Sequence, residues 1–258
     1  FYTHPGQSIL LTGNVAELGN GDVTAALPMD YVNGEFWHGS VLLTTALSTT
    51  IHYHYILKGS DGALTEEWGD DKFIEVPVTG IEELSVIDTW NYAGEYENVF
   101  SAAPFRNVLL PHHKGGKKQK IKGAVTHIFR VKAPLLQADE LVCLLGSASA
   151  LHDWQESDVL LLSPEGDWWT IQLAIPPESF PLEYKYGIYH KKEKRLIRFE
   201  DGPNRRLPGD ARPKKVSILH DGFVHLPNTG FRAAGVSIPV FSLRSMASMG
   251  VGKFSDLP

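Results

Sequence analysis

An aromatic residue suited to stacking on a ligand lies in the segment GSASALHDW, residues 146–154. The apolar run LVCLL ends there, and small polar residues and Trp154 follow in what the composition predicts to be a loop. A tryptophan in a loop exposes a large flat apolar surface unless a ligand or another part of the protein covers it. Trp154 is therefore the first candidate for a binding residue.

Side chains that could hold hydroxyl groups follow in the strings LEYKYG and FEDGPNR. They are Lys185, Glu200 and Asn204, and the aromatic ring of Phe199 lies among them in the sequence. A sugar ring has one hydrophobic C–H face and a belt of hydroxyls, so a sugar site needs flat aromatic rings beside charged or amide groups. Trp154 and Phe199 supply the rings, and the other three side chains supply donors and acceptors. The pattern favours carbohydrate binding.

The sequence contains a weaker copy of these segments. GNVAELGNG at 13–21 matches 146–154, and Gly13 and Leu18 precede Gly146 and Leu151 by 133 residues. Further pairs at nearly the same offset are Trp37 with Trp169, Tyr53 with Tyr184, Trp68 with Phe199, Asp88 with Asp221, and Trp90 with Phe223. A nearly constant offset along the chain predicts two tandem copies of one module.

Both copies have a β pattern. Runs such as TIHYHYIL, WWTIQLAIP and LEYKYGIY are short, rich in β-branched and aromatic residues, and bounded by turn signals such as SDG and SPEGD. This pattern predicts an all-β chain of two tandem immunoglobulin-like antiparallel β-sandwiches. The expected modules are residues 1–100 and 122–227, joined by a linker at 101–121 that is rich in proline, glycine and lysine. Trp37 and Trp169 are expected in the two cores.

Composition narrows the classes of partner. The chain has 258 residues, of which 43% are hydrophobic and 21% charged, and a net charge of −6, which disfavours a nucleic-acid partner. The basic run KGGKKQKIK at 114–122 is interpreted as part of a solvated linker. No apolar run of membrane-spanning length is present, so no membrane partner is expected. The single cysteine, Cys143, fits a buried thiol in a reducing compartment, and we expect a cytoplasmic protein without a cofactor.

The order and spacing of these strings closely resemble the starch-binding domain, carbohydrate-binding module family 20. The resemblance covers the second module almost end to end and implies binding of α-1,4-glucan as starch, glycogen or maltodextrin. It also implies a first binding site made of a loop tryptophan, a lysine, and an aromatic residue, an acid and an asparagine in one loop. Those positions are Trp154, Lys185, Phe199, Glu200 and Asn204. The family usually has a tryptophan where this chain has Phe199.

The first module resembles a degraded form of that site. Gly21 stands where the loop tryptophan is expected, His54 replaces the lysine, and Trp68 is the one platform. Tyr31 falls where the family's second site has a tyrosine, so glucan binding there is an open expectation. His52 and His54, two apart on a strand, suit metal ligation, but no third ligand accompanies them at a sensible spacing, and no metal is expected.

The last residues change the expected parent protein. The segment 234–258, AGVSIPVFSLRSMASMGVGKFSDLP, resembles the opening of the barrel in 4-α-glucanotransferases of glycoside hydrolase family 77. The resemblance implies that 228–258 begin a truncated (β/α)8 barrel and that the parent transfers α-1,4-glucan chains by a retaining mechanism. The family's catalytic carboxylates lie farther downstream, so this stretch is expected to bind and not to catalyse.

Two other functions fit the modules. They could serve another glucan-active protein, such as a glucan phosphatase or dikinase, or they could be structural or dimerisation sandwiches with vestigial sites. The sequence leaves open the preferred glucan, the oligomeric state and the relative orientation of the modules.

Overall fold

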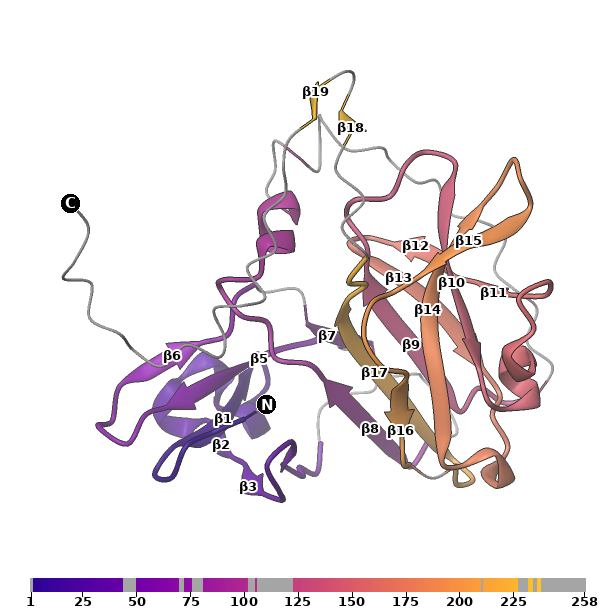
Figure 1. Cartoon of the computed structure of the whole chain (residues 1–258). Coiled ribbons are helices and arrows are strands. Elements are labelled where there is room, and N and C mark those ends of the chain that lie inside the picture. The colour runs from indigo at the N-terminus through magenta and orange to yellow at the C-terminus, as the bar shows by residue number, and fades with distance from the viewer. Residues whose placement is uncertain are drawn as a thin grey trace.

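The structure is a computed structural model that describes residues 2–43, 50–69, 72–75, 81–101, 105, 123–209 and 211–226, and the backbone of 232–233 and 236–237. Strands dominate the described chain, with short 3₁₀ helices between them (Figure 1), which confirms the all-β prediction. The 3₁₀ helices are η1 Ala16–Gly21, η2 Val23–Ala25, η3 Tyr96–Ser101, η5 Ser149–Trp154 and η6 Pro177–Ser179. Among these residues, no helix has the length and hydropathy needed to cross a membrane.

Two of the predicted segments fall mostly outside the described residues. These are the linker at 101–121 and the barrel start at 228–258. Within the second segment, β18 (Arg232–Ala233) and β19 (Val236–Ser237) form a two-stranded antiparallel ladder.

Five strands of the second module form an antiparallel sheet in the order β11-β10-β14-β15, with β16 also paired to β14. Their bounds are β10 Glu140–Gly146, β11 Leu160–Leu161, β14 Leu182–His190, β15 Arg195–Phe199 and β16 Arg205–Leu207. On β14, Tyr184 and Tyr186 point into the core and are buried, while Glu183 and Lys185 between them are partly exposed. This alternation is the period of two that a strand imposes, and it directs Lys185 away from the core.

The first module repeats that topology strand for strand. Its sheet has the order β2-β1-β5-β6, with β7 also paired to β5. The bounds are β1 Ser8–Gly13, β2 Leu27–Pro28, β5 Thr50–Lys58, β6 Leu64–Glu66 and β7 Phe73–Glu75. A separate hairpin consists of β3 (Asp30–Tyr31) and β4 (Trp37–His38). The repeat read in the sequence is thus also a repeat of strand order.

The third large sheet belongs to both modules. Its order is β12-β13-β9-β17-β8, with β8 Glu83–Asp88, β9 His127–Lys132, β12 Ser163–Glu165, β13 Trp168–Leu173 and β17 Lys215–Phe223. The strands β9 and β8 both run parallel to β17, which lies between them. The sequence pattern predicts antiparallel sheets throughout, and the two parallel pairings of β17 depart from that prediction.

The last strand of the first module, β8, joins the two modules. It lies along β17 with six residues in register (Figure 1). Val86 packs against the first module's core cluster and Ile87 against the second module's, so one strand contributes to both. The two modules are therefore not separate sandwiches. An unpaired edge strand exposes a row of backbone hydrogen-bonding groups, and pairing with β8 satisfies those of β17.

The two cores differ in size among the described residues. The cluster of the second module includes Phe129, Leu144 and Trp169, all buried. The first module's cluster contains only Val15, Leu18, Ile51 and Tyr53 as buried members. The prediction that Trp169 is a core residue is confirmed. Buried apolar area drives folding, so a small core gives the first module little stability of its own, and packing against the second module adds to it.

The outer face of the shared sheet is also covered. Trp168, His220 and Arg130 point away from the second core, yet each is less than a tenth exposed. Arg130 donates to the backbone oxygen of Phe73 (3.3 Å) and lies over the Phe73 ring, so β7 of the first module covers part of this face. The junction is consequently a packed interface between the modules.

Candidate carbohydrate-binding site

Trp154 lies at the end of η5 in a strained backbone conformation. Its φ is 60°, and the two residues before it, His152 and Asp153, have φ of 61° and 48°. Residues other than glycine rarely adopt this left-handed region, and each such residue costs of order 1–3 kcal/mol. A run of three therefore needs a surrounding structure that holds it. His152 contributes, because its Nδ1 lies 2.6 Å from the backbone oxygen of Asp158.

The first module builds the same turn from residues that tolerate it. Gly19, Asn20 and Gly21 there have φ of 80°, 51° and 81°. The hydrogen bonds also match, since Asn20 donates to the Val15 oxygen as Asp153 does to its Ala148 counterpart. Gly21 thus occupies the place of Trp154, as the alignment predicted. In the second module the last position of this turn carries a tryptophan in spite of the strain.

The glycine and leucine of the repeated motif form one contact. A Cβ on Gly146 would lie 2.4 Å from a methyl carbon of Leu151 and 2.6 Å from the Glu183 oxygen. On Gly13 it would meet Leu18 at 2.8 Å in the same way. Leu151 is fully buried under η5. The glycine is required because the leucine must come this close to seat the turn on the sheet.

Lys185 and Phe199 lie on the outward face of the second module's sheet. Phe199 on β15 pairs with Gly187 of β14, two residues from Lys185, so the two side chains are diagonal neighbours on one face. Both side chains are partly exposed. The structure therefore brings together one predicted platform and the predicted lysine.

The loop that carries Asn204 is tied to this face by polar contacts. Lys185 Nζ donates to the Gly202 oxygen (2.7 Å), and the exposed Asn204 amide donates to Glu183 Oε2 (3.4 Å). The backbone of Glu183 also exchanges hydrogen bonds with Ser147, at the start of the segment that ends in Trp154. Glu183 thus connects the Trp154 segment to the loop of Asn204. These contacts hold the loop of Asn204 against the face that carries Lys185 and Phe199, and they reach the segment of Trp154 through Ser147.

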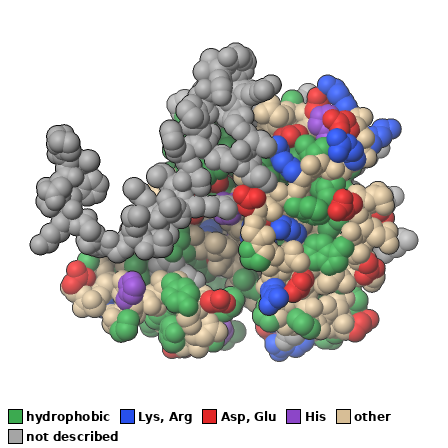
Figure 2. All heavy atoms as spheres, in the orientation of Figure 1, with side chains coloured by type: hydrophobic (Ala, Val, Ile, Leu, Met, Phe, Trp, Pro, Cys, Tyr) green, Lys and Arg blue, Asp and Glu red, His purple; other side chains and the backbone are tan. Residues whose placement is uncertain are grey.

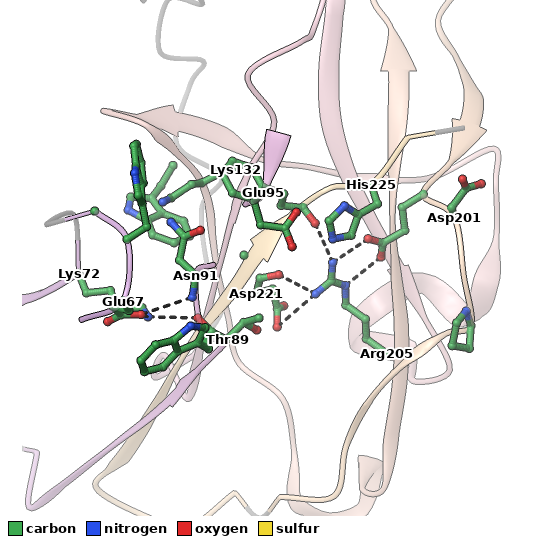
Figure 3. A pocket seen from close by; sticks show the side chains of 18 residues that line it. Glu67, Lys72, Thr89, Asn91, Glu95, Lys132, Asp201, Arg205, Asp221 and His225 are labelled. Atoms are coloured by element: carbon green, nitrogen blue, oxygen red, sulfur yellow. Dashed lines mark hydrogen bonds and ion pairs between the residues drawn. The ribbon is translucent and has the colours of Figure 1, made fainter. Parts of the chain in front are cut away.

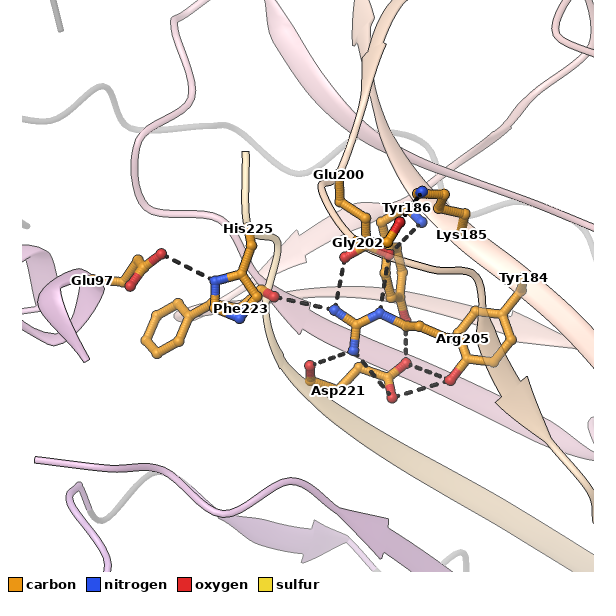
Figure 4. Close-up of polar contacts among 10 residues, drawn as sticks. All are labelled: Glu97, Tyr184, Lys185, Tyr186, Glu200, Gly202, Arg205, Asp221, Phe223 and His225. Carbon is orange, nitrogen blue, oxygen red and sulfur yellow. Dashed lines mark hydrogen bonds and ion pairs between the residues drawn. The ribbon is translucent and has the colours of Figure 1, made fainter. Parts of the chain in front are cut away.

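Glu200 is the exception among the predicted site residues. It is 4% exposed, accepts the backbone N–H of Tyr186 (3.0 Å), and binds Arg205 through both oxygens (3.0 and 2.8 Å; Figure 4). A carboxylate held in this way has no oxygen directed at the outward face. The expectation of direct glucan contact by Glu200 is therefore replaced by a role in holding the loop between Phe199 and Asn204.

A buried network surrounds that ion pair. Tyr184 and Tyr186 donate their hydroxyl protons to Asp221 (3.0 and 2.8 Å), and Arg205 donates to the Asp221 and Phe223 backbone oxygens (Figure 4). Burial raises the pKa of Asp221 and, with the Asp221 charge, raises the pKa of both tyrosines. Burial acts to lower the pKa of Arg205, but Glu200 and Asp221 outweigh it and raise that pKa. Sequence reasoning missed this network, although the alignment paired Asp221 with Asp88.

The first module contains the same network with a lysine. Tyr53 and Tyr55 donate to Asp88 (2.9 and 2.7 Å), Tyr55 N–H donates to Glu67 (3.0 Å), and Lys72 pairs with Glu67. Glu67 is therefore the counterpart of Glu200, and the register places Glu66 opposite Ile56 as Phe199 lies opposite Gly187. Phe199 thus corresponds to Glu66. The alignment that paired Trp68 with Phe199 is shifted by two residues.

Trp68 consequently lies elsewhere than a second copy of the Phe199 platform. It follows β6 at the junction of the modules, is 39% exposed, and donates its backbone N–H to the Asn91 oxygen (3.0 Å). It lines a pocket of about 240 Å3 together with residues of both modules. The first module therefore has a glutamate and His54 where the second has Phe199 and Lys185.

Tyr31 and the histidines of β5 occupy separate places. Tyr31 is 59% exposed on the β3–β4 hairpin, where its ring meets Trp37 edge to face (centroids 5.4 Å apart). Trp37 is only partly buried, so the expected core role describes it less well than Trp169. His54 is partly exposed at the position of Lys185, with Thr12 as its strand partner, while His52 is exposed.

The junction of the modules carries an ionic contact of its own. Glu97 of η3 is buried, and its Oε1 lies 3.3 Å from His225 Nδ1, just after β17. With Glu95, these residues place three potential ligand atoms within 4.8 Å of one another. The hydrogen bond to Glu97 raises the pKa of His225, and although burial opposes it, His225 lowers the pKa of Glu97. The attraction between Glu97 and His225 links η3 to the second module.

The geometry can be compared with known proteins. A family model described as the starch binding domain matches residues 1–85 and 124–218. Over its whole length the chain is 30% identical to 4-alpha-glucanotransferase DPE2 of Oryza sativa subsp. japonica, and it covers 28% of that protein. It is 38% identical over 85 residues, 33% of the chain, to an alpha-amylase of Streptomyces violaceus, of which the match covers 14%. The chain spans less than a third of either curated relative.

One solved structure has the size of a single module. The family 20 module of the maltotetraose-forming amylase from Pseudomonas saccharophila STB07 is 20% identical, with a TM-score of 0.31, over 36% of this chain and 97% of that one. The family model, by contrast, matches more than half of this chain, in two segments that follow the two repeated sheets. The chain belongs to the starch-binding domain family, of which it carries two copies.

Proposed function

We propose that the chain binds α-1,4-glucan as the carbohydrate-binding region of a 4-alpha-glucanotransferase, chiefly through the second module. The observation that carries this proposal is the left-handed backbone of Trp154, at the position where the first module has Gly21. A strained conformation at a bulky residue marks a site where the side chain's direction matters more than stability. Here that side chain is a flat aromatic ring, which can stack on a sugar face.

Each residue of the site has a distinct part in this proposal. Trp154 and Phe199 stack on the hydrophobic faces of glucose units, and the exposed Asn204 amide hydrogen-bonds to their hydroxyls. Lys185 donates to hydroxyls with the ammonium protons that the Gly202 oxygen does not take. Glu200 is a positioning residue, because its ion pair with Arg205 fixes the loop that carries Asn204. Tyr31 offers a weaker contact in the first module.

The role in a glucanotransferase rests on two supports. The rice relative with that printed name matches the chain from end to end, and the segment 234–258 resembles the start of the family 77 barrel. We infer that the binding modules deliver glucan and that catalysis lies outside residues 1–258. In the second module, Glu200 and Asp221 are committed to Arg205 and two tyrosines, which leaves them unsuited to act as nucleophile or acid.

Titration calorimetry with β-cyclodextrin and maltoheptaose tests the proposal. We expect Trp154→Ala to lower the affinity about 5- to 150-fold, because loss of a stacking ring costs about 1–3 kcal/mol by analogy with nucleobase stacking. Tyr2→Ala is the matched control, since it removes an exposed ring of the first module far along the chain from Trp154. Equal affinity of Trp154→Ala and the unmodified protein would refute the proposed site. Absence of binding by the unmodified protein would instead favour the structural or dimerisation role.

A further inference from the structure

A pocket of about 240 Å3 lies where the two modules meet. Glu67, Lys72 and Asn91 line one side, and Asp201, Arg205 and His225 line the other (Figure 3). The molecular surface is hollowed between the two lobes (Figure 2). Neither module alone provides this pocket, and its lining does not include Lys185 or Phe199, although Glu200, Asp201 and Pro203 of the loop after Phe199 take part in it.

Three of the protein's six tryptophans line this junction pocket, and they come from three separate segments. Trp68 follows β6, Trp90 follows β8, and Trp168 begins β13. Trp168 is buried and Trp90 partly buried, whereas Trp68, at 39%, is the most exposed tryptophan of the chain. A large ring left open inside a recess is a surface that a ligand can cover.

The backbone at Trp68 is anchored within the first module. Its backbone N–H donates to the Asn91 oxygen, and the side-chain amides of Asn91 and Asn98 donate to each other (3.1 and 3.0 Å). Asn98 is buried. A backbone anchored before the ligand arrives need not be ordered on binding, which lowers the entropic cost of binding.

The charges around the pocket favour a neutral ligand. Of the lining cations, Lys72 and Arg205 are paired with Glu67 and Glu200, and Lys132 lies over the rings of Trp168 and Phe223. An anion or a cation would have to compete with these buried ion pairs, and breaking such a pair is costly. Carboxylates, amides and an ammonium group at the same surface can nevertheless exchange hydrogen bonds with hydroxyls.

We propose that the junction pocket is an additional glucan-binding site, which takes one end or a short stretch of an α-glucan with Trp68 stacked on a glucose ring. The proposal rests on the function proposed above and adds a site that requires both modules. At about 240 Å3 the pocket is smaller than the roughly 300–1,000 Å3 of pockets that enclose drug-sized ligands. It therefore suits one or two sugar rings, whereas a cyclic oligosaccharide fits only an open face.

Two probes and three variants separate the sites. Maltose and β-cyclodextrin are titrated onto the whole chain, Trp154→Ala, Trp68→Ala and the double variant, with Tyr2→Ala as the control for loss of an exposed ring. We expect Trp154→Ala to lose β-cyclodextrin affinity and to retain maltose binding, and the double variant to lose maltose binding at least tenfold relative to Trp154→Ala. Trp68→Phe should restore part of that loss, because a smaller ring still stacks.

The outcomes distinguish the two proposals. If Trp154→Ala retains no maltose binding, or if Trp68→Ala does not weaken what remains, the junction site is refuted while the Trp154 site stands. If the whole chain binds neither probe, both proposals fail. The melting temperature of every variant is measured as a control. A variant with the melting temperature of the unmodified protein keeps its fold, so its loss of binding reflects the site.

Discussion

His220 of the second module lies 2.6 Å from the Asp88 carboxylate of the first, measured from Nδ1 to Oδ1. Arg130 Nη1 lies 3.3 Å from His220 Nε2. A guanidinium nitrogen can only donate, so His220 Nε2 accepts this hydrogen bond. His220 therefore donates from Nδ1 to Asp88. Both side chains are almost fully buried, so this hydrogen bond joins the modules in the middle of their interface.

We predict that the His220–Asp88 contact stabilises the whole chain. His220→Leu leaves Oδ1 of the buried Asp88 without its donor, while Tyr53 and Tyr55 still donate to Oδ2, and we expect a loss of about 1–3 kcal/mol in the free energy of unfolding. Urea unfolding of the single variants and of the double variant with Asp88→Asn measures the coupling between them. The exposed ion pair of Lys214 and Glu82 also joins the modules, and Lys214→Ala should cost less than about 1 kcal/mol. A similar loss of unfolding free energy in His220→Leu and Lys214→Ala would contradict the prediction that the buried contact contributes more than the exposed one.

Acid should weaken the junction through Asp88. Burial alone would raise the pKa of Asp88, but its interactions with His220, Lys72 and Tyr55 outweigh burial and lower that pKa to about 2. A carboxyl group with a lowered folded pKa contributes stability above its unfolded pKa of about 4, and that contribution is lost as the pH falls toward 2. We expect the unfolding free energy to fall over this range, and to fall less in Asp88→Asn, in urea titrations at several pH values.

The Glu97–His225 pair gives a second pH window. The pKa of His225 is raised, so its contribution is present below its unfolded pKa and is lost as the pH rises through the folded value. The pKa of Glu97 is lowered, so its contribution is lost as the pH falls through the folded value. The link between η3 and the second module should thus be strongest between roughly pH 5 and 6.5. Hydrogen exchange of residues 96–101 measures it, and His225→Gln should flatten the profile.

Relief of backbone strain should separate stability from binding at position 154. Trp154→Gly gives the turn the residue type that the first module uses, and we expect the melting temperature to stay equal or to rise by a few degrees. The same variant should lose β-cyclodextrin binding. Trp154→Ala is the comparison, because it removes the ring but keeps the strained φ. A marked destabilisation by Trp154→Gly would mean that the ring packs as a structural residue.

The reverse change tests whether the first module lacks only its platform. A Cβ on Gly21 meets no atom within 4 Å, so the Cβ of Gly21→Trp causes no clash, and the substitution is strained by the φ of 81°. We expect lower stability and no gain in β-cyclodextrin binding, because the first module has Glu66 and His54 in place of Phe199 and Lys185. A clear gain in affinity, measured in a Trp154→Ala background, would contradict this account of the first module.

The repeat, the β-sheet class and the motif residues could all be predicted from the amino-acid sequence. Each depends on local spacing: Gly146 and Leu151 meet within one turn, and alternation along β14 separates Lys185 from the buried tyrosines. The same spacing aligned Gly21 with Trp154 correctly, since each lies eight residues after the glycine that both modules share, Gly13 or Gly146. Local patterns carry such information because they act through chain neighbours.

The contacts between residues far apart in the sequence became known from the three-dimensional structure. It showed that Glu200 is buried on Arg205, that Trp68 belongs to the junction and not to a copy of the Phe199 platform, and that β8 pairs with β17. Loop lengths differ between the modules, so alignment by residue type slipped by two at Trp68, and only strand register corrected it. The partner of an edge strand and the burial of a carboxylate depend on which surfaces meet when the modules pack, and spacing along one chain does not encode that.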